Sequence, residues 1–209
     1  MKNVTWSSRF SKQIDAEVLE FSQSLNIDIV LFSSDIRVTM AHVDMLESCG
    51  HISSSEKKKI NNGLKKVQKL AEKGKLKWSV DYEDVHMNIE NALVSIIGDV
   101  GKKIHLGRSR NDLVATDLRL YLRDFIDLYI DQLRNIQFAL ANLAVKHSDS
   151  LFPGFTHMQV AQPVTFGHHL LAWSEMIHRD EIRIQNNRES INIMPLGSAA
   201  LSGTSLKIN

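Results

Sequence analysis

Several segments carry side chains that could bind an anion or move a proton. The segment GKKIHLGRSRND, residues 101–112, holds four lysine and arginine side chains and His105 before its first acid, Asp112. Ser109 can cap a helix that starts here, with Asp112 at the third helical position as in a capping box. Capping does not explain the cations, because a helix N-terminus carries partial positive charge. Free N–H groups and arginines at such an end favour binding of a carboxylate or phosphate.

A second candidate surrounds His157 in the segment GFTHMQVAQP. Glycine and proline interrupt this segment, which predicts a loop between two long helices. Thr156 and Gln159 supply neutral hydrogen-bonding groups beside an imidazole that could act as a general base or orient one. A structural role is the competing interpretation for a lone histidine. His86 and Glu90 form a third candidate, for which an ordinary surface pair on one helix face is the competing interpretation.

Apolar residues recur at helical spacing along most of the chain, and they must form the elements that position these groups. The pattern predicts helices that stop at Gly50, Gly74 and Gly98, the second of them starting at a capping box, SSSE, over residues 53–56. From 111 to 148 the apolar residues lie three or four apart, which predicts one helix about 57 Å long. A helix of this length is typical of a bundle.

Pro163 is well placed to begin the next long helix, which should end near Ile191. No strand hairpin is predicted. We therefore expect an all-α fold, with a small N-terminal helical domain over residues 1–107 and the first long helices of a central bundle over 108–209. Apolar residues off the main stripe indicate more than one packed face on the helix over 111–148, which should expose apolar surface where bundle partners are absent.

Composition excludes several classes of function. A net charge of +1 over 209 residues gives no electrostatic reason to expect nucleic acid or a membrane surface as partner. The sequence shows no apolar run near the ~20 residues of a membrane span and no signal peptide. One cysteine, Cys49, cannot form an internal disulfide or a thiolate zinc site, and the histidines lack ligand spacing. We expect a cytoplasmic protein without a metal, and interpret the nine lysines of residues 57–77 as the solvated face of a helix.

Taken together, these segments resemble the argininosuccinate lyase family of the fumarase/aspartase superfamily. GRSRNDLVATDLRLYLRD and LFPGFTHMQVAQPVTFGHHLLAW are closely similar to family signatures. WSSRF, FSQSLNID, YEDVHMNIE and MPLGSAALSGT resemble further family segments and occur in the same order. The resemblance implies an all-α homotetramer with a central bundle. It also implies an enzyme of arginine biosynthesis that splits argininosuccinate into arginine and fumarate by β-elimination, without a cofactor.

The resemblance also implies roles for single residues. Five residues match substrate-binding positions of the family: Ser24, Ser109, Arg110, Asn111 and Thr156. His157 matches the catalytic histidine assigned as the proton acceptor or its partner, and His86 is a weaker pocket candidate. The reaction passes through an intermediate like a doubly charged aci-carboxylate, which needs dense donors and cations. The cationic segment before the long helix would hold a succinyl carboxylate.

Some positions depart from the family pattern. Family members usually carry Thr at Leu106, Gln at Leu113, Arg at Val160 and Gly-Gly at Ser7-Ser8, and these changes bear on the geometry of the pocket. The chain is also less than half as long as a family member, and the family's catalytic serine loop is not in it. Because each family active site combines residues of three subunits, the isolated chain is expected to supply part of a site and to be inactive.

Two alternatives to this function remain open. The first is a sister lyase acting on another succinyl adduct, although GRSRND and FTHMQVAQP are typical of the arginine branch. The second is a crystallin-like or remnant bundle protein that kept the fold and lost the site, which the substitutions and the short length favour. A fumarate-release assay with several substrates distinguishes the sister lyase from an argininosuccinate lyase. Binding of argininosuccinate without turnover identifies the remnant protein.

Overall fold

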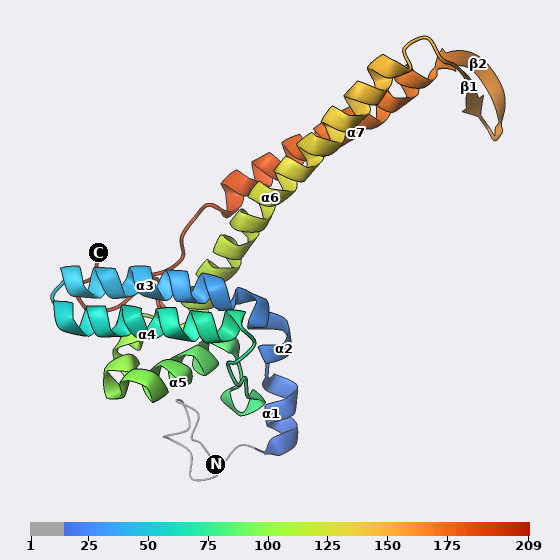
Figure 1. The fold of residues 1–209 in the computed structure, drawn as a ribbon. Helices are drawn as coiled ribbons and strands as arrows, with labels where there is room; N and C mark the ends of the chain where they lie inside the picture. Colours follow the sequence, from blue (N-terminus) through green and yellow to red (C-terminus); the bar gives the residue numbers. More distant parts are fainter. Residues whose placement is uncertain (1–14) are drawn as a thin grey trace. The chain divides into compact units, whose positions relative to one another are not determined.

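The computed structural model describes residues 15–209, so Ser7, Ser8 and the segment WSSRF lie outside the described residues. The chain divides into two compact units, which Figure 1 draws as one ribbon. One unit runs to Leu118 and also includes residues 194–209, and the other comprises residues 119–193. Helices make up most of the described chain, which confirms the all-α class. The domain boundary at residue 107 stays a prediction.

The first unit is built around three packed helices. The packed helices are α3 (Phe32–Ser48), α4 (Ser54–Glu72) and α5 (Val85–Ile97). Two short helices precede them, α1 (Ala16–Ser22) and α2 (Leu25–Asp28). Figure 1 shows α3 and α4 side by side, and both contact α5. Short 3-10 helices span Ile29–Leu31, Val80–Tyr82 and Asp99–His105. The apolar core between the helices includes Ile36, Leu46, Ile60, Leu64, Ile89 and Leu93, all fully buried.

The start of α4 confirms the predicted capping box. The Ser53 N–H donates to Glu56 Oε2 over 3.0 Å, and the Glu56 N–H donates to Ser53 Oγ over 3.2 Å. Lys103 also donates to Glu56, and this bond, with the one from the Ser53 backbone, lowers the pKa of Glu56 to about 2. Along α4 the apolar stripe is buried and the lysines face outward, most of them exposed. The interpretation of the lysine-rich segment as a solvated face is therefore confirmed.

His42 gives this unit a pH-dependent stability. Its side chain is 3% exposed, and Nε2 lies 2.7 Å from the carbonyl oxygen of Leu106. Burial, helped by the charge of Arg108, lowers the pKa of His42 to about 4. Between pH 6.5 and 4 the unfolded chain therefore binds a proton that the folded chain does not, so stability is lost as pH falls through this window. The loss reaches about 3 kcal/mol.

Replacing His42 with Gln should remove this dependence, because a glutamine amide can still donate to Leu106 but does not titrate. We expect His42→Gln to have a lower free energy of unfolding than the unchanged protein at pH 7. Between pH 7 and 4.5 this free energy should fall less in His42→Gln than in the unchanged protein, as measured by urea unfolding. His51 is the matched control, since its Nε2 lies 2.7 Å from the carbonyl oxygen of Lys207 at an exposed position. An identical pH dependence in His42→Gln and the unchanged protein would contradict the prediction.

The second unit is a long helical hairpin with a strand ribbon at its turn. Its elements are the greater part of α6 (Arg110–Lys146), then β1 (Leu151–Thr156), β2 (Gln159–Thr165) and α7 (Phe166–Ile191). Figure 1 shows α7 running back beside α6. Glu181 on α7 accepts hydrogen bonds from Arg134 and Gln137 on α6, and fixes the two helices in register. The predicted helix over 111–148 and the predicted end near Ile191 are confirmed.

The prediction for the segment between α6 and α7 was wrong. Pro163 does not begin a helix but lies in β2, opposite Pro153 in β1, and the two strands form an antiparallel hairpin. Proline is tolerated here because each strand of a two-stranded ribbon has a free edge. Helix α7 begins three residues later, where the Thr165 hydroxyl accepts from the N–H of His168 over 3.1 Å.

Large apolar side chains are exposed along α6, which confirms the expectation for this helix. The exposed fraction is 53% for Phe125, 66% for Leu128 and 71% for Phe138. Burying such side chains against other helices would remove apolar surface from water and so stabilise the hairpin. Large exposed apolar patches are rare on monomers and mark interaction surfaces. Among residues 15–209, no helix combines the length and apolar composition that a membrane-spanning helix needs.

Candidate functional site

The start of α6 has the predicted capping geometry. The Asn111 N–H donates to Ser109 Oγ over 3.2 Å, and the Ser109 N–H donates to Asp112 Oδ1 over 3.0 Å. Asp112 is buried, and its Oδ2 accepts hydrogen bonds from the N–H groups of Gly197 and Ala199 at 3.0 and 2.7 Å. Asp112 therefore caps α6 and also holds the MPLGSAALSGT segment against the helix start.

The cations of residues 101–112 have acidic neighbours in the chain itself. Four of the five contact acids of the same unit: Lys102 with Asp99, Lys103 with Glu56, His105 with Glu90, and Arg110 with Asp84 and Glu83. The explanation offered by the sequence, that an arriving anion accounts for these charges, needs correction. Internal carboxylates offset the charge at the helix N-terminus, and only part of the segment faces a pocket.

A pocket of about 240 Å³ lies beside the start of α6. Its lining comprises Ser24, Asp28, Asp84, His86, Arg110, Asn111 and Val114. Residue 24 precedes α2, Asp84 caps α5, and the last three residues come from the first turns of α6. The structure thus brings together three of the predicted binding residues, Ser24, Arg110 and Asn111, and adds the weaker candidate His86. Ser109 caps the helix and does not line this pocket.

Hydrogen bonds fix one wall of the pocket. Ser24 Oγ donates to Asp28 Oδ2 over 2.6 Å, while Asp28 Oδ1 accepts from the N–H of Val85 over 3.1 Å. This second bond ties α2 to the first residue of α5. Because the Asp28 carboxylate is held at both oxygens, Ser24 keeps a defined position with its oxygen lone pairs available to a ligand.

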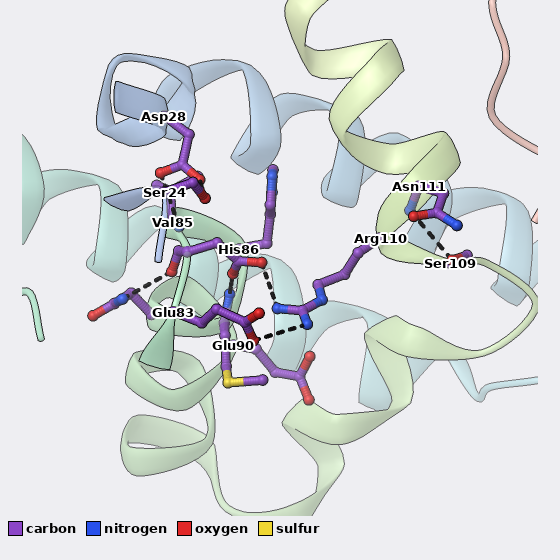
Figure 2. Close-up of polar contacts among 12 residues, drawn as sticks. Ser24, Asp28, Glu83, Val85, His86, Glu90, Ser109, Arg110 and Asn111 are labelled. Atoms are coloured by element: carbon purple, nitrogen blue, oxygen red, sulfur yellow. Dashed lines mark hydrogen bonds and ion pairs between the residues drawn. The ribbon is translucent and has the colours of Figure 1, made fainter. Parts of the chain in front are cut away.

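Arg110 crosses the pocket to the acids before α5. Figure 2 shows its guanidinium reaching from α6 toward Glu83, and it forms ion pairs with Glu83, over 3.3 Å, and with Asp84. Asp84 also caps α5 by accepting from the Met87 N–H over 2.8 Å. Burial raises the pKa of Asp84, and the bonds from Met87 and Arg110 oppose this shift. The pocket therefore carries both signs of charge.

The competing interpretation of His86 and Glu90 as an ordinary surface pair is wrong. His86 is 6% exposed rather than at the surface, and Glu90 contacts His105 instead. His86 Nδ1 lies 2.5 Å from Asp35 Oδ2 and 3.4 Å from Asp117 Oδ2. Both acids are buried and neither was singled out in the sequence. A signal existed in α3, where Asp35, Thr39 and His42 follow helical spacing as a buried polar stripe.

One group of described residues has the side-chain types that bind metals and donor atoms within 4.8 Å of one another. It consists of Asp35, His86 and Asp117. The separation of 2.5 Å between His86 Nδ1 and Asp35 is a hydrogen-bond length. Two ligands on one tetrahedral ion with bonds of about 2.0 Å would lie about 3.3 Å apart. The buried guanidinium of Arg108 already supplies positive charge beside the two acids. We therefore interpret the group as a buried ion network.

The structure places Thr156 and His157 in the other unit. They lie at the tip of the hairpin, where Thr156 pairs with Gln159 and both side chains are exposed. His157 and Met158 form the turn, with φ of 51° and 61°. Left-handed backbone at two adjacent side-chain-bearing residues is uncommon, because such turns favour Asn and Gly. The fold therefore presents the imidazole of His157 at an exposed, sharply turned position.

Argininosuccinate lyases are similar to the chain over nearly its whole length. The chain is 51% identical over 206 residues to the argininosuccinate lyase of Azotobacter vinelandii and 49% identical over 207 residues to that of Chromohalobacter salexigens. Each comparison covers 99% of this chain and 44% of the relative. The chain therefore spans less than half the length of the curated relatives it matches.

Solved structures give the same result for the fold. EDDS lyase in complex with formate matches with a TM-score of 0.77 and 33% identity, over 91% of this chain and 37% of that chain. A fumarate lyase from Mesorhizobium sp. BNC1 shares the fold, with a TM-score of 0.67 at 20% identity over 91% of this chain and 44% of that one. The resemblance to argininosuccinate lyases is confirmed. A protein family described as lyase matches residues 8–209, and the chain belongs to this lyase family.

Proposed function

We propose that the complete protein containing this chain is an argininosuccinate lyase of arginine biosynthesis. It breaks a C–H bond beside a carboxylate of the succinyl group and the neighbouring C–N bond to the guanidinium. The carbon–carbon double bond that forms gives fumarate, and the nitrogen leaves with a proton as arginine. We further propose that the reaction needs no cofactor, and that the enzyme is a cytoplasmic homotetramer.

The observation that carries this proposal is the convergence of Ser24, Arg110 and Asn111 in one pocket. The guanidinium of Arg110 and the amide of Asn111, together with the N-terminus of α6, suit a carboxylate, while the lone pairs of Ser24 Oγ suit a donor group of the substrate. Asp28 and Asp84 in the same lining suit an ammonium or guanidinium group. A substrate with carboxylates, an amino group and a guanidinium, such as argininosuccinate, matches both charges. The identity of about 50% to argininosuccinate lyases supports the same substrate.

We place Thr156 and His157 in the completed site, where they would be supplied by assembly of subunits. Ser109 would act through the helix start, whose N–H groups it organises. Because the chain spans 44% of the relatives, we propose that it forms part of a site and is inactive when isolated. The exposed apolar side chains of α6 support assembly, since association would bury them.

The proposal is tested by fumarate release from a panel of succinyl adducts by the complete protein. We expect argininosuccinate to give the highest kcat/KM, and Arg110→Met to lower that value by about a hundredfold or more, as for loss of a carboxylate-binding cation. Val114→Ala, in the same pocket lining and without charge, is the control and should retain most activity.

The similarity to EDDS lyase favours a second candidate, a lyase for another succinyl adduct. A variant of EDDS lyase was solved with fumarate bound. Preference for a different adduct in the panel would select this candidate. Binding of argininosuccinate without release of fumarate would instead select a crystallin-like protein that kept the fold and lost the reaction.

A further inference from the structure

The buried group behind the pocket has no role in the function proposed so far. Asp117 is fully buried, yet neither of its carboxylate oxygens has a hydrogen-bond partner among the described residues. His86 lies between this group and the pocket: its Nδ1 faces Asp35 and Asp117, and the residue lines the pocket. The other ring nitrogen, Nε2, is buried and also lacks a partner within residues 15–209.

Three helices contribute charge around His86. Asp35 comes from α3, Asp84 from the N-cap of α5 and Asp117 from α6, and all three act on the imidazole. The guanidinium of Arg108, just before α6, also acts on Asp35 and Asp117 and donates to Thr39 over 2.9 Å. Arg110 and Asp28 are further charged groups in the lining of the same pocket, and Glu83 pairs with Arg110. Three acids thus surround one imidazole, and a protonated ring balances them best.

We propose that Asp35 and Asp117 are positioning residues, which hold the His86 ring through Nδ1 and keep it protonated so that Nε2–H donates to a substrate carboxylate in the pocket. This inference rests on the proposed function for its ligand. Neither acid touches the substrate. Asp35 orients the ring by accepting the Nδ1 proton, and Asp117 adds a second negative charge that favours the imidazolium.

The electrostatics of the group agree with this geometry. Burial disfavours a charged imidazole, but the hydrogen bond to Asp35 and the charges of the surrounding acids outweigh it and raise the pKa of His86. Burial and the neighbouring Asp35 raise the pKa of Asp117 to about 8. Asp117 and His86 therefore compete for one proton near neutral pH, and an anion arriving beside Nε2 favours the state with the proton on His86.

The first measurement is the protonation state of His86 in the complete protein. Histidine labelled with ¹⁵N distinguishes imidazolium from neutral imidazole, and the His86→Gln variant assigns the signal. We expect His86 to be imidazolium at pH 7 when fumarate occupies the pocket, and to bind its proton less tightly in Asp117→Asn. A neutral His86 at pH 7 with fumarate bound would overturn the proposal, whether or not the protein splits argininosuccinate.

The second measurement is the pH profile of kcat/KM. Removing a negative charge weakens proton binding by His86. As the pH rises, activity that needs the imidazolium is therefore lost at a lower pH than in the unchanged protein. We expect the basic limb to move down by about one pH unit in Asp117→Asn, which is a tenfold loss of kcat/KM on that limb. Asp35→Asn should shift the limb similarly, and Asp35→Ala should also lower kcat/KM at acidic pH, since only asparagine keeps an acceptor for Nδ1–H.

Asp44→Asn is the matched control, because Asp44 lies on the same helix as Asp35 but pairs with Lys57 at the surface. Its profile should match that of the unchanged protein. Equal profiles in Asp44→Asn and Asp117→Asn would overturn the proposal, since a merely structural role changes stability and not the limb. Absence of turnover in the unchanged protein, with an imidazolium at His86, would refute the proposed function and leave the role of the acids standing.

Discussion

Replacing His157 with asparagine should abolish turnover by the complete protein while leaving its oligomeric state unchanged. A positioned acid–base group contributes about 10²–10⁴ in rate, so a loss of about a thousandfold in kcat is expected. The substitution should not disturb the hairpin, because asparagine adopts the φ of 51° found at this position more readily than histidine does. Steady-state fumarate release and light scattering on the same sample test both parts.

Met158→Asn is the control for the turn. Met158 follows His157 in the same turn, with φ of 61°, and its side chain is fully exposed. This variant changes the turn without removing the imidazole and should retain most of the rate. Retained turnover in His157→Asn would exclude His157 from catalysis. Equal losses in the two variants would assign the effect to the geometry of the hairpin instead.

The helices could be predicted from the sequence because their signals are local. The stripe that predicts a helix over 111–148 needs only the spacing of neighbouring residues, and the observed helix spans Arg110–Lys146. The reciprocal bonds of Ser53 with Glu56 likewise join residues three apart. The hairpin was missed because the Gly and Pro of Phe152–Pro163 indicate a loop, while the strand pairing that tolerates them is decided by contacts across the ribbon.

The candidate site could be predicted only in part, because its contacts are distant in sequence. Ser24 and Arg110 were identified through family resemblance, but no spacing rule places residues 86 positions apart in one pocket. The cations before α6 were recognised, whereas their acidic partners, such as Glu56 for Lys103, come from other helices. Asp117 was overlooked because a single acid beside an apolar stripe reads as solvent-exposed until the fold buries it.

Replacing Arg108 with methionine should destabilise the first unit by about 3–5 kcal/mol, the cost of leaving buried charge without its partner. Arg108 is 8% exposed and lies beside Asp35 and Asp117, the two acids that also contact His86. Methionine fills much of the space of the arginine stem, so lost charge rather than a cavity accounts for the effect. Urea unfolding of the complete protein, followed by hydrogen exchange in α3 and α6, measures it. Lys102→Met, at an exposed ion pair of the same segment, should cost less than about 1 kcal/mol.

A second substitution shows whether uncompensated charge is the reason. Asp117→Asn removes one of the two carboxylates that Arg108 balances, so Arg108→Met combined with Asp117→Asn should be more stable than Arg108→Met alone. We expect the two changes to depart from additivity by about 1–3 kcal/mol, as for residues of one buried network. Additive losses would mean that Arg108 stabilises the unit through packing and its bond to Thr39. Non-additive losses would mean that α3, α5 and α6 are held together by a balance of buried charges, with His86 at the point where that balance meets the pocket.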